Sequence, residues 1–312
     1  MTTSSKWNLA QGTVVTGRWK GGRYVVQRLL GQGANGIVYL VKHANTARLY
    51  AMKLGFDTLD LQSEINVLKA VQRARSRSLG ENRNAPYLVE VDDYTFQGRE
   101  IPFYVMRYVK GEPLRAFLAH KGGQWLHVAG LHLLQQLRAL HEAGWAFGDL
   151  KPENVLVSPS GEVELIDYGG VSAIGKSIKQ YTEWYDRGFW NTGSRMAESS
   201  YDWFSFAVVC IHLLAEGPLK RAAQQLPQTR GRNDLLLIVQ SEAALAPFRS
   251  WLELALRGEF RDTTHACQLW KKLVTGPYIA RRTRVKTPGW MVGAFALSLT
   301  LLGCALYLSL RF

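Results

Sequence analysis

Four charged or amide side chains occur within the eight-residue stretch Phe-Gly-Asp-Leu-Lys-Pro-Glu-Asn at positions 147–154. In this pattern Asp149 would orient an attacking hydroxyl group and accept its proton. Lys151 would neutralise charge on a phosphoryl group in transfer, and Asn154 would hold a Mg²⁺ ion through its amide oxygen. The stretch therefore indicates phosphoryl-transfer chemistry.

A second carboxylate follows Asp149 further along the chain, in the triplet Asp167-Tyr168-Gly169. This triplet comes directly after an expected strand at 162–166, and Asp167 would be a second Mg²⁺ ligand that connects the metal to phosphate oxygens. An Asp-Tyr-Gly triplet is common by chance, so its weight comes from its order and spacing relative to the other motifs.

A glycine-rich segment, Gly-Gln-Gly-Ala-Asn-Gly-Ile-Val, occupies positions 31–38. Gly31, Gly33 and Gly36 would let backbone N–H groups approach a phosphate chain without obstruction by side chains. A dinucleotide-binding fold would need a helix directly after these glycines. A strand at 36–42 is expected instead, which excludes that fold.

Lys53 lies near the end of a third expected strand, at 49–54, which follows the glycine segment. A lysine at a strand end is usually a solvated charge, but this one could reach phosphates held by the glycine segment. Glu64, on the polar side of an expected helix at 59–73, could pair with the Lys53 ammonium group and hold it in place.

Two groups of elements surround these residues. Strands are expected at 24–30, 36–42, 49–54, 87–96 and 101–109, with one helix at 59–73, whereas helices predominate from Pro113 to Val274. Short strands at 154–157 and 162–166 precede a long stretch without a regular period. The pattern predicts an α+β fold with a small antiparallel β lobe that contains one helix, followed by a larger helical lobe.

Together these motifs resemble the eukaryotic-like (Hanks-type) protein kinase family over about residues 24–274. The resemblance implies a bilobal Ser/Thr protein kinase that uses ATP with Mg²⁺, or alternatively Mn²⁺, and phosphorylates protein hydroxyl groups, its own included. It implies that Asp149, Lys151 and Lys53 are catalytic and that Asn154 and Asp167 bind metal. The residues implied to bind the nucleotide are Gly31, Gly33, Gly36, Val38, Ala51, Lys53, Glu64, Met106 as gatekeeper, Arg107, Val109 and Leu156.

An aromatic run at 180–190 gives a narrower resemblance, to the tail-anchored kinases of spore-forming bacteria, and implies a role in sporulation. Its aromatic side chains either pack onto the large lobe or form an exposed patch for a substrate or a second kinase molecule. A second copy is also suggested by Gly289 and Gly293, whose spacing is that of a helix-dimerisation motif.

Several positions depart from the family pattern. Phe147 and Gly148 replace the usual His-Arg, so phosphorylation at Thr182, Thr192 or Ser194 is not expected to be the activating switch. Asp202 is expected to brace the catalytic loop, and Glu198 would pair with Arg261 if it is the counterpart of the family's Ala-Pro-Glu glutamate. These departures leave a pseudokinase scaffold, which binds nucleotide without transfer, as the alternative function; a small-molecule kinase is a third.

The net charge of the 312-residue chain is +13, but it is concentrated near the C-terminus. Seven basic residues follow the last acidic residue, Asp262, so the rest of the chain is only mildly basic. The clustered cations could bind DNA non-specifically or anionic lipid; they are Lys271, Lys272, Arg281, Arg282, Arg284 and Lys286. The basic run at Lys69, Arg73, Arg75 and Arg77 is expected to be a solvated face. Three scattered cysteines exclude a disulfide-stapled secreted domain.

The segment 289–310 contains no charged residue and is long enough for one membrane-spanning helix. The basic residues before it predict a single-pass protein of the cell membrane with its N-terminal body in the cytoplasm. The expected organisation is a flexible tail at 1–19, a kinase domain at 20–274 with lobes at 20–109 and 110–274, a basic arm at 275–288 and the anchor at 289–310.

Overall fold

The computed structural model describes residues 8–33, 35–79 and 87–275, together with a few positions between 297 and 303. The chain divides into two compact units between Lys271 and Lys272, and the elements discussed below belong to the first unit, except for the last residues of helix α8. The basic arm 275–288, apart from Thr275, and nearly all of the expected anchor 289–310 lie outside the described residues. The predicted domain boundaries therefore stay predictions.

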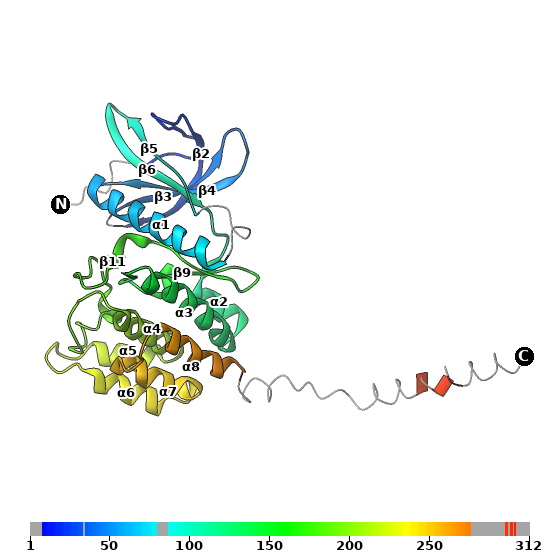
Figure 1. The fold of residues 1–312 in the computed structure, drawn as a ribbon, viewed down its shortest axis with the longest axis vertical. Helices are drawn as coiled ribbons and strands as arrows, with labels where there is room; N and C mark the ends of the chain where they lie inside the picture. The colour runs from blue at the N-terminus through cyan, green and yellow to red at the C-terminus, as the bar shows by residue number, and fades with distance from the viewer. Residues whose placement is uncertain are drawn as a thin grey trace, which may run out of the picture. The chain divides into compact units, whose positions relative to one another are not determined.

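The small lobe is built on a six-stranded antiparallel sheet with strand order β1-β2-β3-β4-β6-β5 (Figure 1). Its strands are β1 (Val14–Thr16), β2 (Arg23–Gly33), β3 (Gly36–His43), β4 (Leu49–Gly55), β5 (Leu88–Phe96) and β6 (Arg99–Arg107). Buried Val15, Tyr24, Met52 and Phe103 belong to one apolar cluster on this sheet. Apolar and β-rich runs in the sequence predicted these strands, with the exception of β1, which is very short.

The turn after β1 is attached to the far edge strand, β5. The backbone N–H of Arg18 donates to the Asp93 carbonyl oxygen at 2.9 Å. The Asp92 carboxylate accepts the N–H groups of Trp19 at 2.9 Å and Lys20 at 2.8 Å. These bonds connect the two edges of the sheet and leave the Trp19 ring exposed.

Helix α1 (Thr58–Leu79) packs on this lobe through buried Leu61, Ile65 and Leu68. Asp57 caps its first turn by accepting the N–H groups of Leu59 at 2.8 Å and Asp60 at 3.0 Å. The helix continues beyond residue 73, where the apolar spacing predicted its end. Its extension contains mainly Arg, Ser, Ala and Leu, without a helix-breaking residue before Gly80.

The large lobe is mainly helical, with α4 at its centre and most of that helix buried (Figure 1). Phe206 of α4, Phe248, Trp251 and Trp270 contact one another through their rings, at centroid distances of 4.9–5.3 Å. Its helices are α2 (Leu114–Lys121), α3 (Leu126–Glu142), α4 (Ser199–Leu214), α5 (Glu216–Ala223), α6 (Arg232–Ser241), α7 (Arg249–Arg257) and α8 (Thr263–Thr275).

Short strands lie directly before α2 and in the connection between α3 and α4. The expected pair at 154–157 and 162–166 forms as β9 (Val155–Val157) and β10 (Val163–Leu165), and β9 also pairs with β7 (Glu112–Pro113). The two-residue strands β8 (Trp145–Ala146) and β11 (Ser172–Ala173) pair with each other. The segment between β10 and α4, expected to lack a regular period, contains β11, 3-10 turns at Tyr168–Gly170 and Glu183–Tyr185, and an isolated bridge between Ser177 and Met196.

Among the described residues, no individual helix has both the length and the apolar composition needed to cross a membrane. Helices α4 and α5 meet the criterion only when taken together, and they are bent by 119° relative to each other. Because α4 is buried inside the large lobe, its apolar composition is that of a core helix.

Candidate active site

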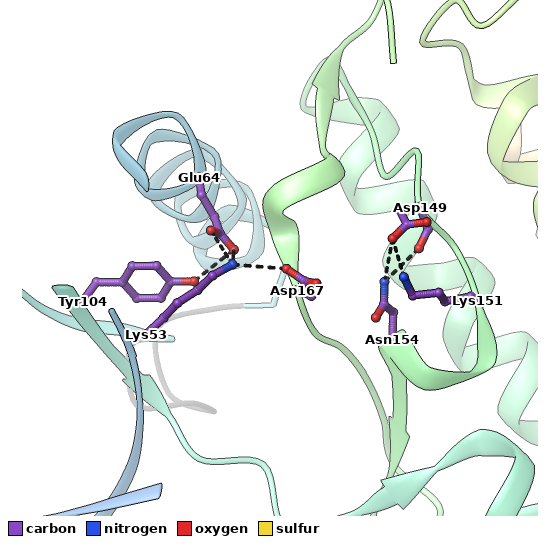
Figure 2. Close-up of polar contacts among 7 residues, drawn as sticks. All are labelled: Lys53, Glu64, Tyr104, Asp149, Lys151, Asn154 and Asp167. Carbon is purple, nitrogen blue, oxygen red and sulfur yellow. Dashed lines mark hydrogen bonds and ion pairs between the residues drawn. The ribbon is translucent and has the colours of Figure 1, made fainter. Parts of the chain in front are cut away.

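The Lys53 side chain in β4 is buried and bonded to Glu64 of α1. Its Nζ donates to Glu64 Oε2 at 2.8 Å and Oε1 at 3.0 Å, and Tyr104 Oη donates to Oε1 at 3.0 Å (Figure 2). Lys53 Nζ also lies 3.2 Å from Asp167 Oδ1. The pair expected from the sequence therefore forms, and it extends to the expected metal ligand.

Burial and charge act in opposite directions on this pair. Burial alone would lower the pKa of Lys53, but the carboxylates of Glu64 and Asp167 outweigh it and raise that pKa above its ordinary value. Burial also raises the pKa of Glu64, and the Lys53 charge offsets part of this effect. A lysine that stays protonated here is suited to hold negatively charged phosphates.

The second cluster of polar side chains is centred on Asp149 (Figure 2). Lys151 Nζ lies 2.7 Å from Asp149 Oδ2, and Asn154 Nδ2 donates to the Asp149 carbonyl oxygen at 2.9 Å. Thr182 Oγ1 donates to Asp149 Oδ1 at 2.8 Å and accepts from Lys151 Nζ at 3.3 Å. These contacts orient the Asp149 carboxylate from both of its oxygens.

Thr182 was not among the site residues predicted from the sequence. It lies in the segment without a regular period, where spacing gives no information about which side chains meet the catalytic loop. The fold nevertheless brings its hydroxyl group to the Asp149 carboxylate. Through this hydrogen bond Thr182 helps to position the Asp149 carboxylate.

The backbone of the catalytic loop is held by Asp202 of α4, as expected. The N–H groups of Phe147 and Gly148 donate to the Asp202 carboxylate at 2.7 and 2.9 Å, and His141 Nε2 lies 2.8 Å from it. Gly148 has a φ of +81°, and a Cβ there would lie 2.9 Å from the Gly170 carbonyl oxygen. The local backbone therefore favours glycine at the position where the family has arginine.

The three glycines of the β2–β3 hairpin differ in what surrounds them. At Gly31 and Gly33 a Cβ would meet no atom within 4 Å, so the backbone is open there. At Gly36 a Cβ would clash with the Leu54 carbonyl oxygen, so this glycine allows β3 and β4 to approach each other closely. The first two therefore leave space beside the backbone, and the third has a packing role.

The remaining expected nucleotide-binding residues lie on strands around the same region. Ala51 of β4 pairs with Met106 of β6, and Val38 of β3 pairs with Lys53. Leu156 of β9 lies opposite Glu164, which forms an ion pair of 2.6 Å with Arg107. Val109 follows β6 in the connection to the large lobe. Their predicted roles toward adenine stay predictions.

Asn154 and Asp167 supply the oxygen atoms that a Mg²⁺ ion prefers. The Asn154 amide nitrogen is bonded to the catalytic loop, and the described residues provide no donor for its Oδ1. The Asp167 carboxylate is 47% exposed, and the residue has a φ of 60°. No cluster of three His, Cys, Asp or Glu residues forms in the described parts of the chain. Two protein ligands plus phosphate oxygens fit the usual coordination of Mg²⁺.

Comparison with known proteins agrees with this geometry. The protein kinase domain family matches residues 24–274. The chain belongs to the protein kinase family. It is 34% identical over 300 residues to the serine/threonine-protein kinase YabT of Bacillus subtilis, covering 92% of this chain and 85% of that protein. The chain is therefore a bacterial Hanks-type serine/threonine protein kinase.

Solved structures share the fold at lower identity. The kinase domain of PknI from Mycobacterium tuberculosis superposes with a TM-score of 0.55 at 22% identity, covering 86% of this chain and 100% of that one. Vaccinia related kinase 3 superposes with a TM-score of 0.61 at 18% identity, covering 88% and 95%. These similarities support the kinase fold, with its β-sheet lobe and helical lobe.

The activation segment of this kinase, residues 167–198, is held by a buried carboxylate. Asp186 accepts the N–H groups of Gly188 at 3.0 Å and Phe189 at 3.1 Å. Arg195 Nε and Nη2 each lie 2.7 Å from Asp186 Oδ2, and Tyr201 Oη donates to Oδ1 at 2.9 Å. This side chain, completely buried, fixes the middle of the segment without a phosphate group.

One predicted ion pair in this segment was wrong. Glu198 pairs with Arg187, at a shortest distance of 3.4 Å, whereas Arg261 pairs with its neighbour Asp262. Arg187 belongs to the same segment as Glu198, and the fold of the segment brings the two together. The Arg187 guanidinium group also lies 5.4 Å from the centre of the Tyr201 ring, which helps to hold it beside Glu198.

Some aromatic side chains at 180–190 are packed onto the large lobe, and one is exposed. Trp190 and Tyr185 are buried, as expected for packing onto the large lobe, whereas Tyr181 is 44% exposed. The Tyr181 ring stacks under the Arg195 guanidinium group at 4.1 Å. Packing therefore accounts for most of the aromatic run.

A separate contact joins the activation segment to α1. Lys179 Nζ donates to Ser63 Oγ at 2.5 Å, and Ser63 directly precedes Glu64. Gly148 stands where the family has an arginine in the catalytic loop. Lys179 connects the activation segment directly to α1, without using that loop.

Proposed function

We propose that this kinase transfers the ATP γ-phosphate to serine and threonine hydroxyl groups of proteins, its own chain included, with Mg²⁺ as the metal. The observation that supports this most directly is the Lys53–Glu64 pair, at 2.8 Å, which coexists with the oriented Asp149 carboxylate. The alternative, a pseudokinase scaffold, would use the Lys53–Glu64 pair to bind nucleotide but would have no use for the oriented Asp149 carboxylate.

In the proposed reaction the hydroxyl oxygen of the substrate attacks the γ-phosphorus atom, and Asp149 accepts the hydroxyl proton. The new P–O bond forms while the bond between the γ-phosphorus and the bridging oxygen breaks, and ADP leaves. Lys151, 2.7 Å from Asp149, is placed to neutralise charge on the phosphoryl group, and Lys53 holds the phosphates that stay on ADP. The metal would be held by Asn154 and Asp167 and would offset the phosphate charge.

The test is transfer of radiolabelled phosphate from ATP by the full chain in detergent, to itself and to a generic basic protein. We expect incorporation that Asp149→Asn reduces by about 10² to 10⁴-fold, the usual contribution of a general base. Lys53→Ala should also abolish it. Lys42→Ala, an exposed lysine on β3, is the matched control and should keep full activity. Nucleotide binding without transfer in the unaltered protein would favour the scaffold.

We also propose that residues 289–310 anchor the kinase in the cell membrane with its catalytic body in the cytoplasm. The support is sequence alone: an uncharged segment of spanning length, preceded by Arg281, Arg282, Arg284 and Lys286. The full chain should stay with membranes in alkaline carbonate, and a variant that ends at residue 288 should not. Recovery of the full chain in the soluble fraction would contradict the anchor.

The six cations between Lys271 and Lys286, two at the end of α8 and four in the basic arm, are proposed to bind DNA or anionic lipid and so to regulate transfer. Six cations clustered in this short stretch support an electrostatic contact, which should weaken steeply with salt. Autophosphorylation measured with DNA or with anionic vesicles, each at two salt concentrations, distinguishes the two ligands. Replacing the six cations by glutamine should remove the effect, and an unchanged response would contradict this role.

A further inference from the structure

A cavity of about 560 Å³ lies on the small lobe, away from the residues of the catalytic cleft. It is formed by the C-terminal half of α1, the first half of β5 and the turn that follows β1. Three cationic side chains line it, Lys69 and Arg73 from α1 and Lys20 from the turn. As the sequence had suggested, Lys69 and Arg73 are exposed, and the structure places both beside this cavity.

The carboxylates of the lobe offset only part of this positive charge. Within the described residues, no carboxylate lies at ion-pair distance from Lys20, Lys69 or Arg73. Glu90 is the acidic residue of the lining, with Oε2 accepting the Tyr24 hydroxyl at 2.8 Å, and its negative charge offsets one of the three cations. The cavity therefore carries an excess of positive charge.

Lys20 is held in place by its backbone. Its N–H donates to Asp92 at 2.8 Å, and a Cβ at Gly17 of the same turn would clash with Asp92 Oδ2. Burial opposes the charge of the Asp92 carboxylate, but three backbone N–H groups and Lys20 outweigh it and lower its pKa below the ordinary value. The position of the Lys20 backbone beside the cavity is therefore fixed by its contact with Asp92.

The rest of the cavity is apolar or neutral. Leu88, Val89 and Val91 of β5 contribute apolar surface, and Val89 is 40% exposed. The Gln72 side chain accepts the N–H of Leu88 at 3.1 Å and joins α1 to β5 at this point. A ligand that matches the site combines a compact, highly charged anion with apolar neighbours.

We propose that this cavity binds a phosphothreonine or phosphoserine side chain presented by a protein segment. A phosphomonoester carries close to two negative charges and three acceptor oxygens, which suits three cations converging on one cavity. A nucleic acid backbone spreads single charges along its length and offers no aliphatic side chains for the β5 valines and leucine. Segments of this kind are the products of serine/threonine kinases, so the proposal rests in part on the proposed function.

Occupation of the cavity would act on catalysis through α1. Lys69 and Arg73 follow Glu64 on this helix, whereas Lys20 is attached to β5 through Asp92. A phosphate group that bridges the helix and the turn stabilises the arrangement in which α1 packs on β5. Because the same helix holds Glu64 against Lys53, binding favours the paired state of the catalytic lysine.

The test is calorimetric titration of the full chain, in detergent, with a short peptide that has phosphothreonine between two leucines. We expect the unphosphorylated peptide to bind at least about tenfold more weakly. Phosphate transfer to a generic protein should increase about fivefold when the phosphopeptide saturates the site. Equal binding of the two peptides would overturn the proposal, and because binding is measured without ATP, this outcome is distinct from a failure of transfer.

Charge reversal locates the site. Lys20→Glu and Arg73→Glu should each weaken phosphopeptide binding about tenfold or more, whereas Lys42→Glu, an exposed lysine on β3, should leave it unchanged. Thermal unfolding of each variant checks that the lobe is intact, and Arg73→Lys should restore part of the affinity. An equal loss in Lys42→Glu would overturn the proposal.

Competition with inorganic phosphate and with an oligonucleotide shows which kind of phosphate compound the cavity binds. Inorganic phosphate should displace the peptide only at much higher concentration, because it lacks the apolar neighbours. A single-stranded oligonucleotide should not bind in an Arg73-dependent way. Oligonucleotide binding that Arg73→Glu abolishes, without phosphopeptide binding, would assign the cavity to nucleic acid and overturn the proposal.

Discussion

Glu64 of the small lobe and Asp186 of the activation segment are both buried carboxylates paired with a cation, yet they differ in their other partners. Glu64 accepts hydrogen bonds from two side chains, Lys53 and Tyr104. Asp186 accepts from two backbone N–H groups as well as from Arg195 and Tyr201. Lys53 also contacts Asp167, which is half exposed, whereas Arg195 lies over the Tyr181 ring.

The difference separates a functional ion pair from a structural one. Glu64 holds Lys53, and the same lysine also contacts the Asp167 carboxylate. The Lys53 charge therefore also acts on a group other than Glu64. Asp186 uses its oxygens to fix the chain around it, since its backbone donors come from Gly188 and Phe189 just after it. Changes at the first pair should therefore affect transfer, and changes at the second should affect stability.

The largest expected effect follows the replacement Lys53→Met. Without the ammonium group the phosphates lose their buried cation, and kcat/KM should fall about 10³-fold, or roughly 4 kcal/mol of transition-state stabilisation. Steady-state transfer to a generic protein measures it. Arg195→Met is the matched change at the other carboxylate and should keep at least a tenth of the activity. Equal losses of kcat/KM in the two variants would contradict the distinction between a functional and a structural ion pair.

Arg195→Met should instead lower the free energy of unfolding, by about 2 kcal/mol. Breaking a buried ion pair typically costs more, but the Arg195 side chain is 44% exposed and three donors to Asp186 remain. Urea unfolding gives the value. Arg221→Met, an exposed arginine on α5, is the control, and a matching small loss in both variants would show that Asp186 does not need its cation.

A third effect depends on pH and appears in Lys53→Met. Burial already raises the pKa of Glu64 from its ordinary value of 4.5, and loss of Lys53 should raise it further. The folded state then keeps the Glu64 proton to higher pH than the unfolded state, so stability should decrease as pH rises above 4.5, by at most about 1.4 kcal/mol per unit.

Urea unfolding of Lys53→Met at a series of pH values from mildly acidic to mildly basic measures this slope. The double variant Lys53→Met/Glu64→Gln has no group that titrates at this position and should lack the additional slope. If the single and double variants depend on pH in the same way, the buried carboxylate is not its source.

The smallest expected effect concerns Glu198, whose pair with Arg187 has a shortest distance of 3.4 Å and is partly exposed. Glu198→Gln should reduce stability by about 0.5 kcal/mol. A double-mutant cycle should show coupling of Glu198 with Arg187 and none with Arg261. Coupling with Arg261 alone would restore the partner expected from the sequence.

Much of this architecture could be predicted from local patterns. The strands of the small lobe are runs rich in apolar and β-branched residues, and most of the catalytic and metal-binding residues occur in contiguous motifs at 147–154 and 167–169. The Lys53–Glu64 pair could be predicted because the two residues lie on adjacent elements, one at a strand end and one on the following helix. Short motifs and neighbouring elements thus determine most of the site.

The remainder depends on contacts across irregular chain. Thr182, Asp186 and Arg187 lie in a segment without a period, so no spacing was available from which to place their side chains. The cavity at Lys20 requires a turn near the N-terminus to reach β5, distant in the sequence, through Asp92. Contacts between residues so far apart in the sequence cannot be predicted from the periodicity or spacing of nearby residues.

The positions of the tryptophans give the two lobes different optical signatures. Trp19 is 70% exposed, and among the described tryptophans it is the one in the small lobe. Trp251 and Trp270 are buried within the aromatic cluster of the large lobe. Emission from the exposed indole should lie to the red and be quenched by acrylamide, whereas the buried pair should emit to the blue. Loss of the blue emission should therefore report unfolding of the large lobe in an unlabelled sample.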